Sequence, residues 1–163
     1  MTTDKDLLLQ LLVEEQRWVF PYFDYQAGWE LGSAMREAAL AANYPVAILI
    51  RRSGQRIFHT ALPGSCADND AWLERKSAVV DRFGHSSYYM GCLARADGDE
   101  DFNVRFRLDT DRFAAHGGAF PLNVVKSGCI GSVAVSGLPQ VEDHKFVVEQ
   151  LSLFLSTFAS AVD

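Results

Sequence analysis

Apolar residues recur at helical spacing in several stretches of the chain, and this pattern predicts amphipathic helices. The predicted helices cover residues 4–17, 26–42, 68–83 and 88–96, and a last helix begins near residue 140. The last helix has the most regular apolar stripe, which runs over His144, Val147, Val148, Leu151, Phe154, Leu155, Phe158 and Val162. One face of each helix should therefore pack against a common core.

Between the helices, shorter apolar runs bounded by turn residues predict two β-hairpins. In the first, Tyr44–Ile50 is continuously apolar and Arg56–Leu62 alternates by twos. In the second, Leu122–Val125 is followed by Cys129–Val135. Each connection contains a serine followed by a glycine, as a tight turn requires: Ser53–Gly54 and Ser127–Gly128.

Two further stretches are less regular. Trp18–Tyr25 is aromatic and contains Pro21, so we expect a short edge strand, because proline cannot donate to a central ladder. Within Asp97–Ala115, apolar residues alternate with arginines from Val104 to Leu108, which favours a strand. The acidic and turn residues around this alternation make an extended surface loop equally compatible with the sequence.

Helices at both ends with hairpins between them predict an α+β protein, an antiparallel sheet with helices packed on it. The chain has 163 residues, of which 48% are hydrophobic, enough for one buried core and few for two. No linker or internal repeat interrupts it. Residues 1–163 are therefore expected to form a single domain.

The net charge and the length of the apolar runs argue against two classes of partner. A net charge of −6 disfavours nucleic acid, because phosphate binding needs clustered basic residues. The Leu7–Val13 run is followed at once by Glu14 and Glu15, and no apolar run approaches the ~20 residues that span a bilayer. We therefore expect a cytoplasmic protein with neither a nucleic acid nor a membrane as partner. The cysteines are isolated and predict neither a disulfide framework nor a zinc site: Cys66, Cys92 and Cys129.

The predicted helix 68–83 contains a charged residue in its apolar stripe. Lys76 occupies the position that continues the stripe four residues after Trp72, and Arg75 borders the same face. Two interpretations remain open. The two side chains either bury their stems and keep their charged ends in water, or they line a site for a carboxylate or phosphate, with Arg75 as a bidentate donor.

The stretch His116–Pro121 combines a histidine, a glycine pair and an aromatic residue immediately before the second hairpin. Gly117 and Gly118 permit a turn with positive φ and a close backbone approach, and Phe120 follows them. His144 lies in the first turn of the last helix, where the helix dipole favours a neutral imidazole able to bind a metal. A structural or exposed role for either histidine is the alternative. No spacing typical of a metal site is present, so no metal site is predicted.

These motifs resemble the haem-degrading domain family, which includes the glycolate-operon G protein and the HbpS haem-binding proteins. The motifs that carry the resemblance are His116–Pro121, Gly128–Gly137 and Asp143–His144. Further similarity, to the branch termed uncharacterised protein family 0303, extends over nearly the whole chain: Phe58–His59, Leu62–Gly64, Asp68–Asn69, Trp72, Arg75–Lys76 and Ser86–Tyr88. One position departs from the pattern, because Leu138–Pro139 stands where haem-binding members usually have two glycines.

The resemblance implies a layered, profilin-like domain that assembles into a homo-oligomer, and it implies haem as a possible cofactor. In that hypothesis His116 or His144 ligates the iron, while Arg75 and Lys76 pair with the propionates. We therefore expect a small-ligand pocket between the glycine pair, the Arg75–Lys76 helix and the start of the last helix, with haem or another acidic tetrapyrrole as the leading ligand. Two alternatives remain: an enzyme acting on a small anionic metabolite, with His144 as acid–base, and a non-catalytic oligomeric binding module.

Overall fold

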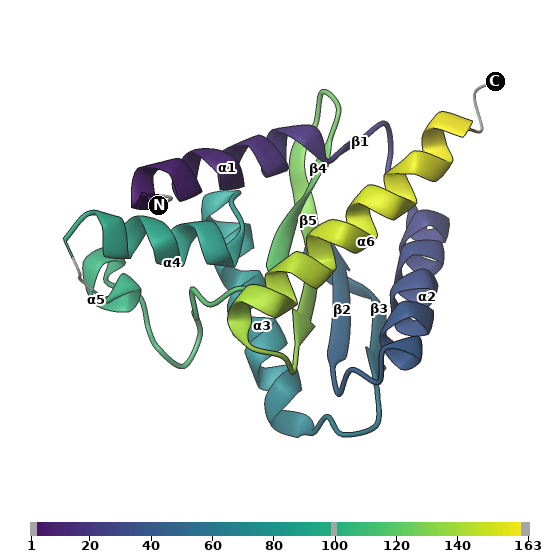
Figure 1. The fold of residues 1–163 in the computed structure, drawn as a ribbon, viewed down its shortest axis with the longest axis horizontal. Coiled ribbons are helices and arrows are strands. Elements are labelled where there is room, and N and C mark those ends of the chain that lie inside the picture. Colours follow the sequence, from purple (N-terminus) through teal and green to yellow (C-terminus); the bar gives the residue numbers. More distant parts are fainter. Residues whose placement is uncertain (1–2, 99–100, 161–163) are drawn as a thin grey trace.

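The computed structural model describes residues 3–98 and 101–160, with side chains up to Phe158. In chain order the elements are α1 (Asp4–Arg17), β1 (Val19–Phe20), α2 (Tyr25–Ala41), β2 (Ala47–Arg52), β3 (Gln55–Ala61), α3 (Ala67–Phe83), α4 (Ser87–Ala96), α5 (Phe102–Phe106), β4 (Ala119–Val124), β5 (Gly128–Ser136) and α6 (Gln140–Ser160). Figure 1 shows α6 crossing one face of the central sheet, with α3 on the opposite face. The predicted α+β class is confirmed.

Within the described residues the sheet has five strands in the order β1-β4-β5-β2-β3. The two predicted hairpins, β2–β3 and β4–β5, lie side by side because β2 also pairs antiparallel with β5. The short edge strand expected before Tyr25 is present as β1. It pairs parallel with β4, so the sheet is mixed rather than wholly antiparallel. The parallel pairing follows from the long connection between β1 and β4, which returns the chain in the same direction.

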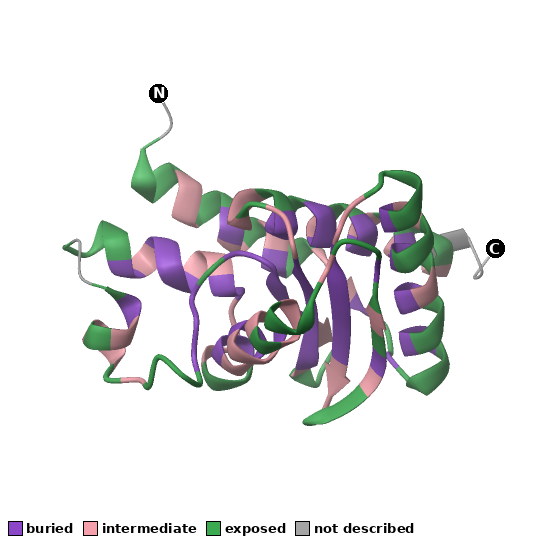
Figure 2. Cartoon of the chain, turned by 90° about the horizontal axis from the view of Figure 1, so that it is seen from below, coloured by how far each residue is buried: buried purple, intermediate pink, exposed green. Residues whose placement is uncertain are grey.

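Alternating side chains divide the sheet into two packed faces. On one face Ile48, Phe120 and Val133 join the main core with α2 and α6. On the other face Leu49 and Ala134 pack against α3. Figure 2 shows the resulting pattern, with the central strands buried and the outer surfaces of the helices exposed. The elements α3, α4 and α5 enclose a smaller apolar cluster beside the sheet.

Local sequence accounts for the helix ends. Ser86 caps α4 by accepting a hydrogen bond from the Tyr89 amide, and Gly84 ends α3 in the left-handed conformation at φ 69°. The start of α3 is capped by a pair of residues. Cys66 is the N-cap residue of α3. The side chain of Asn69, in the first turn of the helix, accepts the Cys66 amide hydrogen at 2.9 Å.

The stretch Asp97–Ala115 contains no strand among its described residues, so the strand alternative is wrong. Its centre is the short helix α5, which begins at the capping carboxylate of Asp101. Phe102 is buried against the α3–α4 cluster, and Phe106 packs beside it. Because tertiary packing of these phenylalanines outweighs the alternation of the local sequence, the segment folds as a helical turn followed by a loop.

Candidate functional site

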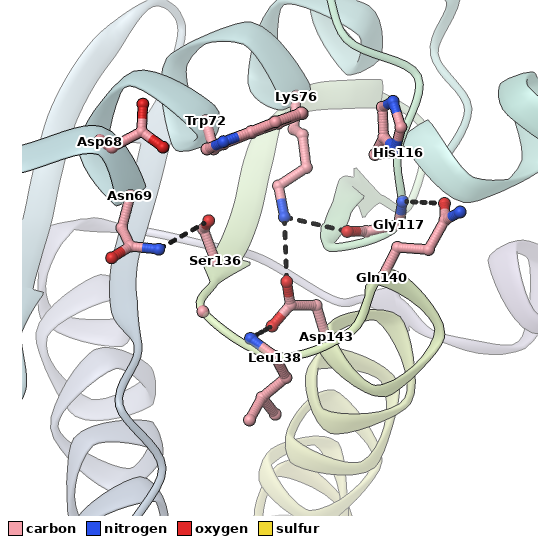
Figure 3. A pocket seen from close by; sticks show the side chains of 11 residues that line it. Asp68, Asn69, Trp72, Lys76, His116, Gly117, Ser136, Leu138, Gln140 and Asp143 are labelled. Atoms are coloured by element: carbon pink, nitrogen blue, oxygen red, sulfur yellow. Dashed lines mark hydrogen bonds and ion pairs between the residues drawn. The ribbon is translucent and has the colours of Figure 1, made fainter. Parts of the chain in front are cut away.

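A polar cleft of about 290 Å³ lies between α3, the glycine pair and the start of α6. We call it the Lys76 cleft (Figure 3), and its principal lining residues come from those three segments: Asn69, Trp72, Lys76, His116, Gly117, Gln140 and Asp143. The location is the one expected from the sequence. Asn69 and Trp72 lie one turn apart on α3, so both face the same opening.

Lys76 reaches the centre of this region and is 2% exposed. Its Nζ donates to the backbone oxygen of Val135 at 2.6 Å and to that of Gly117 at 2.9 Å. Its third contact is with the carboxylate Oδ2 of Asp143 at 3.3 Å (Figure 3). One lysine therefore joins α3, the glycine pair, the end of β5 and the first turn of α6.

Burial shifts the pKa of each partner in the direction that favours its neutral form. It lowers the pKa of the Lys76 amine, although the Asp143 charge opposes this. It also raises the pKa of the Asp143 carboxyl, although Lys76 and the Leu138 amide oppose this. Asp143 Oδ1 accepts that amide hydrogen at 3.0 Å. Lys76 and Asp143 thus form a buried pair with shifted pKa values beside a polar cleft, a feature that is common at functional sites.

The glycine pair is explained by close approach on both sides. A Cβ on Gly117 would lie 2.2 Å from the backbone oxygen of Gln140, and one on Gly118 would lie 2.3 Å from Lys76 Nζ. Gly118 also has a φ of 135°, which residues with a side chain rarely adopt. Glycine is therefore needed at both positions to leave space for the Lys76 side chain and for the start of α6. A phosphate-binding loop is not needed to explain the pair.

The side chain of Arg75, the other predicted basic residue, does not point in the same direction as that of Lys76. Its guanidinium stacks 4.2 Å from the centroid of the Trp72 ring, and its Nε donates to the Ala71 oxygen. The Lys76 nitrogen meanwhile directs its hydrogens at protein oxygens. The two residues therefore do not converge on one anion position in this structure.

His116 also lines the Lys76 cleft, and its ring centroid lies 5.2 Å from the Trp72 ring centroid in an edge-on arrangement. Partial burial lowers the pKa of this imidazole, and the positive charge of Lys76 lowers it further. The side chain is consequently neutral near pH 7, and it is able to accept or relay a proton. Phe120, the aromatic residue of the same motif, is fully buried in the main core and does not line the Lys76 cleft.

His144 faces a different cavity from its neighbour Asp143. It lines a groove of about 560 Å³ bounded by α1, α4 and the start of α6, which we call the His144 groove. The wall of this groove is mainly apolar and is formed by Leu7, Leu9, Leu11, Val13, Tyr88 and Val141. Consecutive helix residues point about 100° apart, which places Asp143 and His144 in separate sites.

The His144 ring is 4% exposed and lies 5.0 Å from the Tyr88 ring centroid. Its Nε2 contacts the Glu14 carboxylate at 3.2 Å. Its Nδ1 is buried and has no hydrogen-bond partner among the described residues. A buried ring nitrogen without a partner is uncommon in proteins, and it leaves the hydrogen bonding of His144 incomplete.

Sequence reasoning did not identify Asp143, Trp72 or Glu14 as site residues. For Asp143 a signal was present, because a carboxylate in the first turn of a helix often binds amide hydrogens there. The pairing of Glu14 with His144 had no local signal, since 130 positions separate them. Within the described ranges 3–98 and 101–160, no group of three or more His, Cys, Asp or Glu side chains is placed to hold a metal ion. Nor does any helix there have the length and apolar character needed to cross a membrane.

Comparison with known proteins identifies one matching family model and several relatives with similar sequences. The family model described as haem degrading protein HbpS-like matches residues 23–152. A UPF0303 protein from Streptomyces avermitilis is 52% identical over 147 residues, which cover 90% of each chain. A UPF0303 protein from Serratia proteamaculans is 41% identical over 162 residues and 99% of each chain.

Two solved structures are similar to this chain in fold. The crystal structure of the Ybr137w protein superposes with a TM-score of 0.86 at 36% identity, covering 93% of this chain and 89% of that one. The PduOC:heme complex superposes with a TM-score of 0.66 at 16% identity, covering 80% of this chain and 93% of that one. At that identity the second likeness shows the fold alone.

Proposed function

Because the chain belongs to the HbpS-like haem-degrading protein family, we propose that it binds haem or a related acidic tetrapyrrole in the His144 groove. The observation that carries this proposal is the buried imidazole of His144, with its unpartnered Nδ1, at the wall of an apolar groove. The proposed ligand site therefore differs from the one expected from the sequence, which corresponds to the Lys76 cleft.

The size and lining of the groove suit a flat apolar macrocycle. Its volume of about 560 Å³ lies within the range of ~300–1,000 Å³ typical of ligand pockets, whereas the Lys76 cleft is smaller and more polar. Leucine and valine side chains of α1 would contact the ring system. Burial raises the pKa of Tyr88, which also lines the groove, and this favours a neutral phenol beside the ligand.

The polar residues of the groove match the other parts of the ligand. Histidine is a common axial ligand of haem iron, so His144 would be the residue that holds the metal. Arg17 and Lys145 also line the groove, and their positive charges would pair with propionates in the role first assigned to Arg75 and Lys76. Haem, when bound, would supply iron-centred redox or oxygen chemistry. The PduOC:heme complex has the same fold and supports haem as the ligand to be tested first.

The test is a hemin titration of the full-length protein followed by its Soret absorption. We expect saturable binding of one hemin per chain, and we expect His144→Ala to shift the Soret band and to weaken binding by about tenfold or more. His116→Ala is the matched control, because it removes a histidine from the Lys76 cleft and should leave the titration unchanged. Thermal unfolding of each variant verifies that the fold is intact.

Two results would overturn the proposal. One is a titration in which His144→Ala and the wild-type protein behave alike. The other is a loss of binding in His116→Ala only, which would return the ligand to the Lys76 cleft.

A further inference from the structure

We propose that the Lys76 cleft is a second ligand site, which binds an uncharged sugar of monosaccharide size through polar side chains that the protein itself leaves without hydrogen-bond partners. This site is separate from the His144 groove, and the inference does not depend on haem binding there. It rests on the contacts of the Lys76 nitrogen, on the unpartnered groups that line the cleft and on the size of the cleft.

The Lys76 nitrogen is fully engaged by protein oxygens and is not available to an anion. Its three contacts are the backbone oxygens of Val135 and Gly117, at 2.6 and 2.9 Å, and Asp143 Oδ2 at 3.3 Å. A lysine nitrogen has at most three N–H groups, so none remains for a ligand. Asp68 adds a second carboxyl group to the lining of the cleft. A phosphate or carboxylate would therefore meet two carboxyl groups without a free cation to bind it.

Other polar groups at the cleft have unused hydrogen-bonding capacity. Four of them make no hydrogen bond within the described residues 3–98 and 101–160: the Asp68 carboxylate, the Trp72 indole N–H, the His116 ring nitrogens and Gln140 Nε2. The Gln140 side chain uses only its oxygen, which accepts the Gly117 amide hydrogen at 3.1 Å. The indole and amide N–H groups are donors and the carboxylate is an acceptor, so the cleft offers both kinds of group to a ligand.

A mixed set of donors and acceptors selects a hydroxylated ligand. A hydroxyl group both donates and accepts hydrogen bonds, whereas a carboxylate only accepts and an ammonium only donates. Several hydroxyl groups on one uncharged molecule can therefore bind the Asp68 carboxylate and the Gln140 amide at the same time. Sugars have this arrangement of neighbouring hydroxyl groups.

The size and the aromatic border of the cleft favour a single sugar ring. Its volume of about 290 Å³ lies at the lower end of the range of ~300–1,000 Å³ typical of ligand pockets. The rings of Trp72 and His116 lie side by side at one border, with centroids 5.2 Å apart (Figure 3). Arg75 stacks on the Trp72 ring and helps to fix its position. An aromatic border of this kind suits the C–H groups of a sugar ring, which an acyclic compound such as glycerol does not hold in one fixed face.

Two competing explanations are that the cleft holds only water and that it binds a small anion. The variant Asp68→Asn separates them from a sugar site. Asp68 is exposed, so the change should leave the fold intact. It removes a negative charge and one acceptor oxygen, which should weaken the binding of a sugar and strengthen the binding of an anion.

The experiment titrates the full-length protein separately with D-glucose, D-galactose, D-mannose, D-xylose and D-ribose, and follows binding by saturation-transfer difference NMR. We expect saturable binding of at least one sugar, and we expect glycerol to bind at least about tenfold more weakly. Asp68→Asn and Gln140→Glu should each weaken binding by about tenfold. Gln140→Glu retains a side-chain oxygen for the Gly117 amide, so it removes only the donor. The control is Glu37→Gln, which removes an exposed carboxylate of α2 away from the cleft and should leave the affinity unchanged.

Thermal unfolding of each variant verifies that its fold is intact. Three results would overturn the proposal. The first is the absence of saturable binding for all of the sugars, which would leave the cleft to water. The second is an unchanged affinity in both Asp68→Asn and Gln140→Glu, which would place the sugar elsewhere on the protein. The third is displacement of the bound sugar by inorganic phosphate together with tighter phosphate binding in Asp68→Asn, which would identify an anion site.

Discussion

Lys76 and Asp143, which are separated by 67 positions in the sequence, place the lysine Nζ and the aspartate Oδ2 3.3 Å apart in the interior. Both side chains are about 3% exposed, so water contributes little to their solvation. Their contact closes the Lys76 cleft at its base and fixes the first turn of α6. The next residue along α6, His144, belongs to the other cavity, so the same turn of helix positions both candidate sites.

The buried pair predicts a large loss of stability when one partner is removed. Lys76→Met leaves the Asp143 carboxylate and two backbone oxygens without the lysine, and we expect it to lower the free energy of unfolding by about 3–5 kcal/mol. Replacing both residues, as in Lys76→Met with Asp143→Leu, should cost clearly less than the sum of the single changes. Urea denaturation measures all three variants. A loss below about 1 kcal/mol for Lys76→Met would contradict the contacts described here.

The glycine pair provides a test of close packing. Gly118→Ala combines a positive φ with a collision against Lys76 Nζ and the Val135 oxygen, so we expect a loss of about 3 kcal/mol or more. Gly84→Ala is the matched control, because Gly84 also has a positive φ but has no atom within 4 Å of the added Cβ. It should cost only about 1 kcal/mol. Equal losses in the two variants would show that backbone conformation alone requires Gly118.

A second buried carboxylate should anchor α1. Glu15 is 5% exposed and contacts His85 Nδ1 at 2.6 Å, and it accepts the Ser86 amide hydrogen at 2.8 Å at the start of α4. Glu15→Ala removes both contacts, and we expect a loss of about 2–3 kcal/mol. The exposed neighbour Gln16 is the control, since Gln16→Ala should change the unfolding free energy by less than about 0.5 kcal/mol. Chemical denaturation followed by far-ultraviolet circular dichroism gives both values.

The imidazole of His116 predicts a pH dependence of stability. Burial and the Lys76 charge lower its pKa in the folded protein, so the unfolded chain binds a proton more readily at this residue. The contribution of His116 is therefore fully present above the unfolded pKa of ~6.5 and is lost as the pH falls through that value towards the lower folded pKa. Denaturation of the wild type and of His116→Gln between pH 8 and 5 should show the wild type losing stability relative to the variant below ~6.5. A constant difference over this range would exclude the mechanism.

The exposed aromatic residues of the α2 region predict self-association. Trp29 is 61% exposed, and Tyr22 and Tyr25 are exposed nearby in the sequence, so we expect these side chains to be covered in a homo-oligomer. Light scattering at micromolar concentration should give a mass that is a multiple of 18.1 kDa. Trp29→Glu should reduce that mass, while Val104→Glu, at an exposed apolar residue of α5, should not. A stable wild-type monomer would refute the expectation.

Local patterns of apolar and polar residues were sufficient to predict much of the fold. The stripe of α6 and the alternation in β3 are each produced by one face of one element, so neighbouring residues carry the information. The same holds for the capping residues Ser86 and Gly84, which act within a single turn of backbone. The sequence also identified Lys76 as a charge inside an apolar stripe, because that anomaly is visible within one helix.

The tertiary structure decided which of these residues meet. Asp143 contacts Lys76, and Glu14 contacts His144, across separations that no periodicity records. The division of Asp143 and His144 between two cavities depends on where α6 begins relative to α1 and α3. Contacts of this kind arise when whole elements pack, and their energies depend on burial, which a linear pattern does not contain. The chain alone therefore determined most of the elements and the unusual lysine, while packing determined the helix α5 and the partners of each site residue.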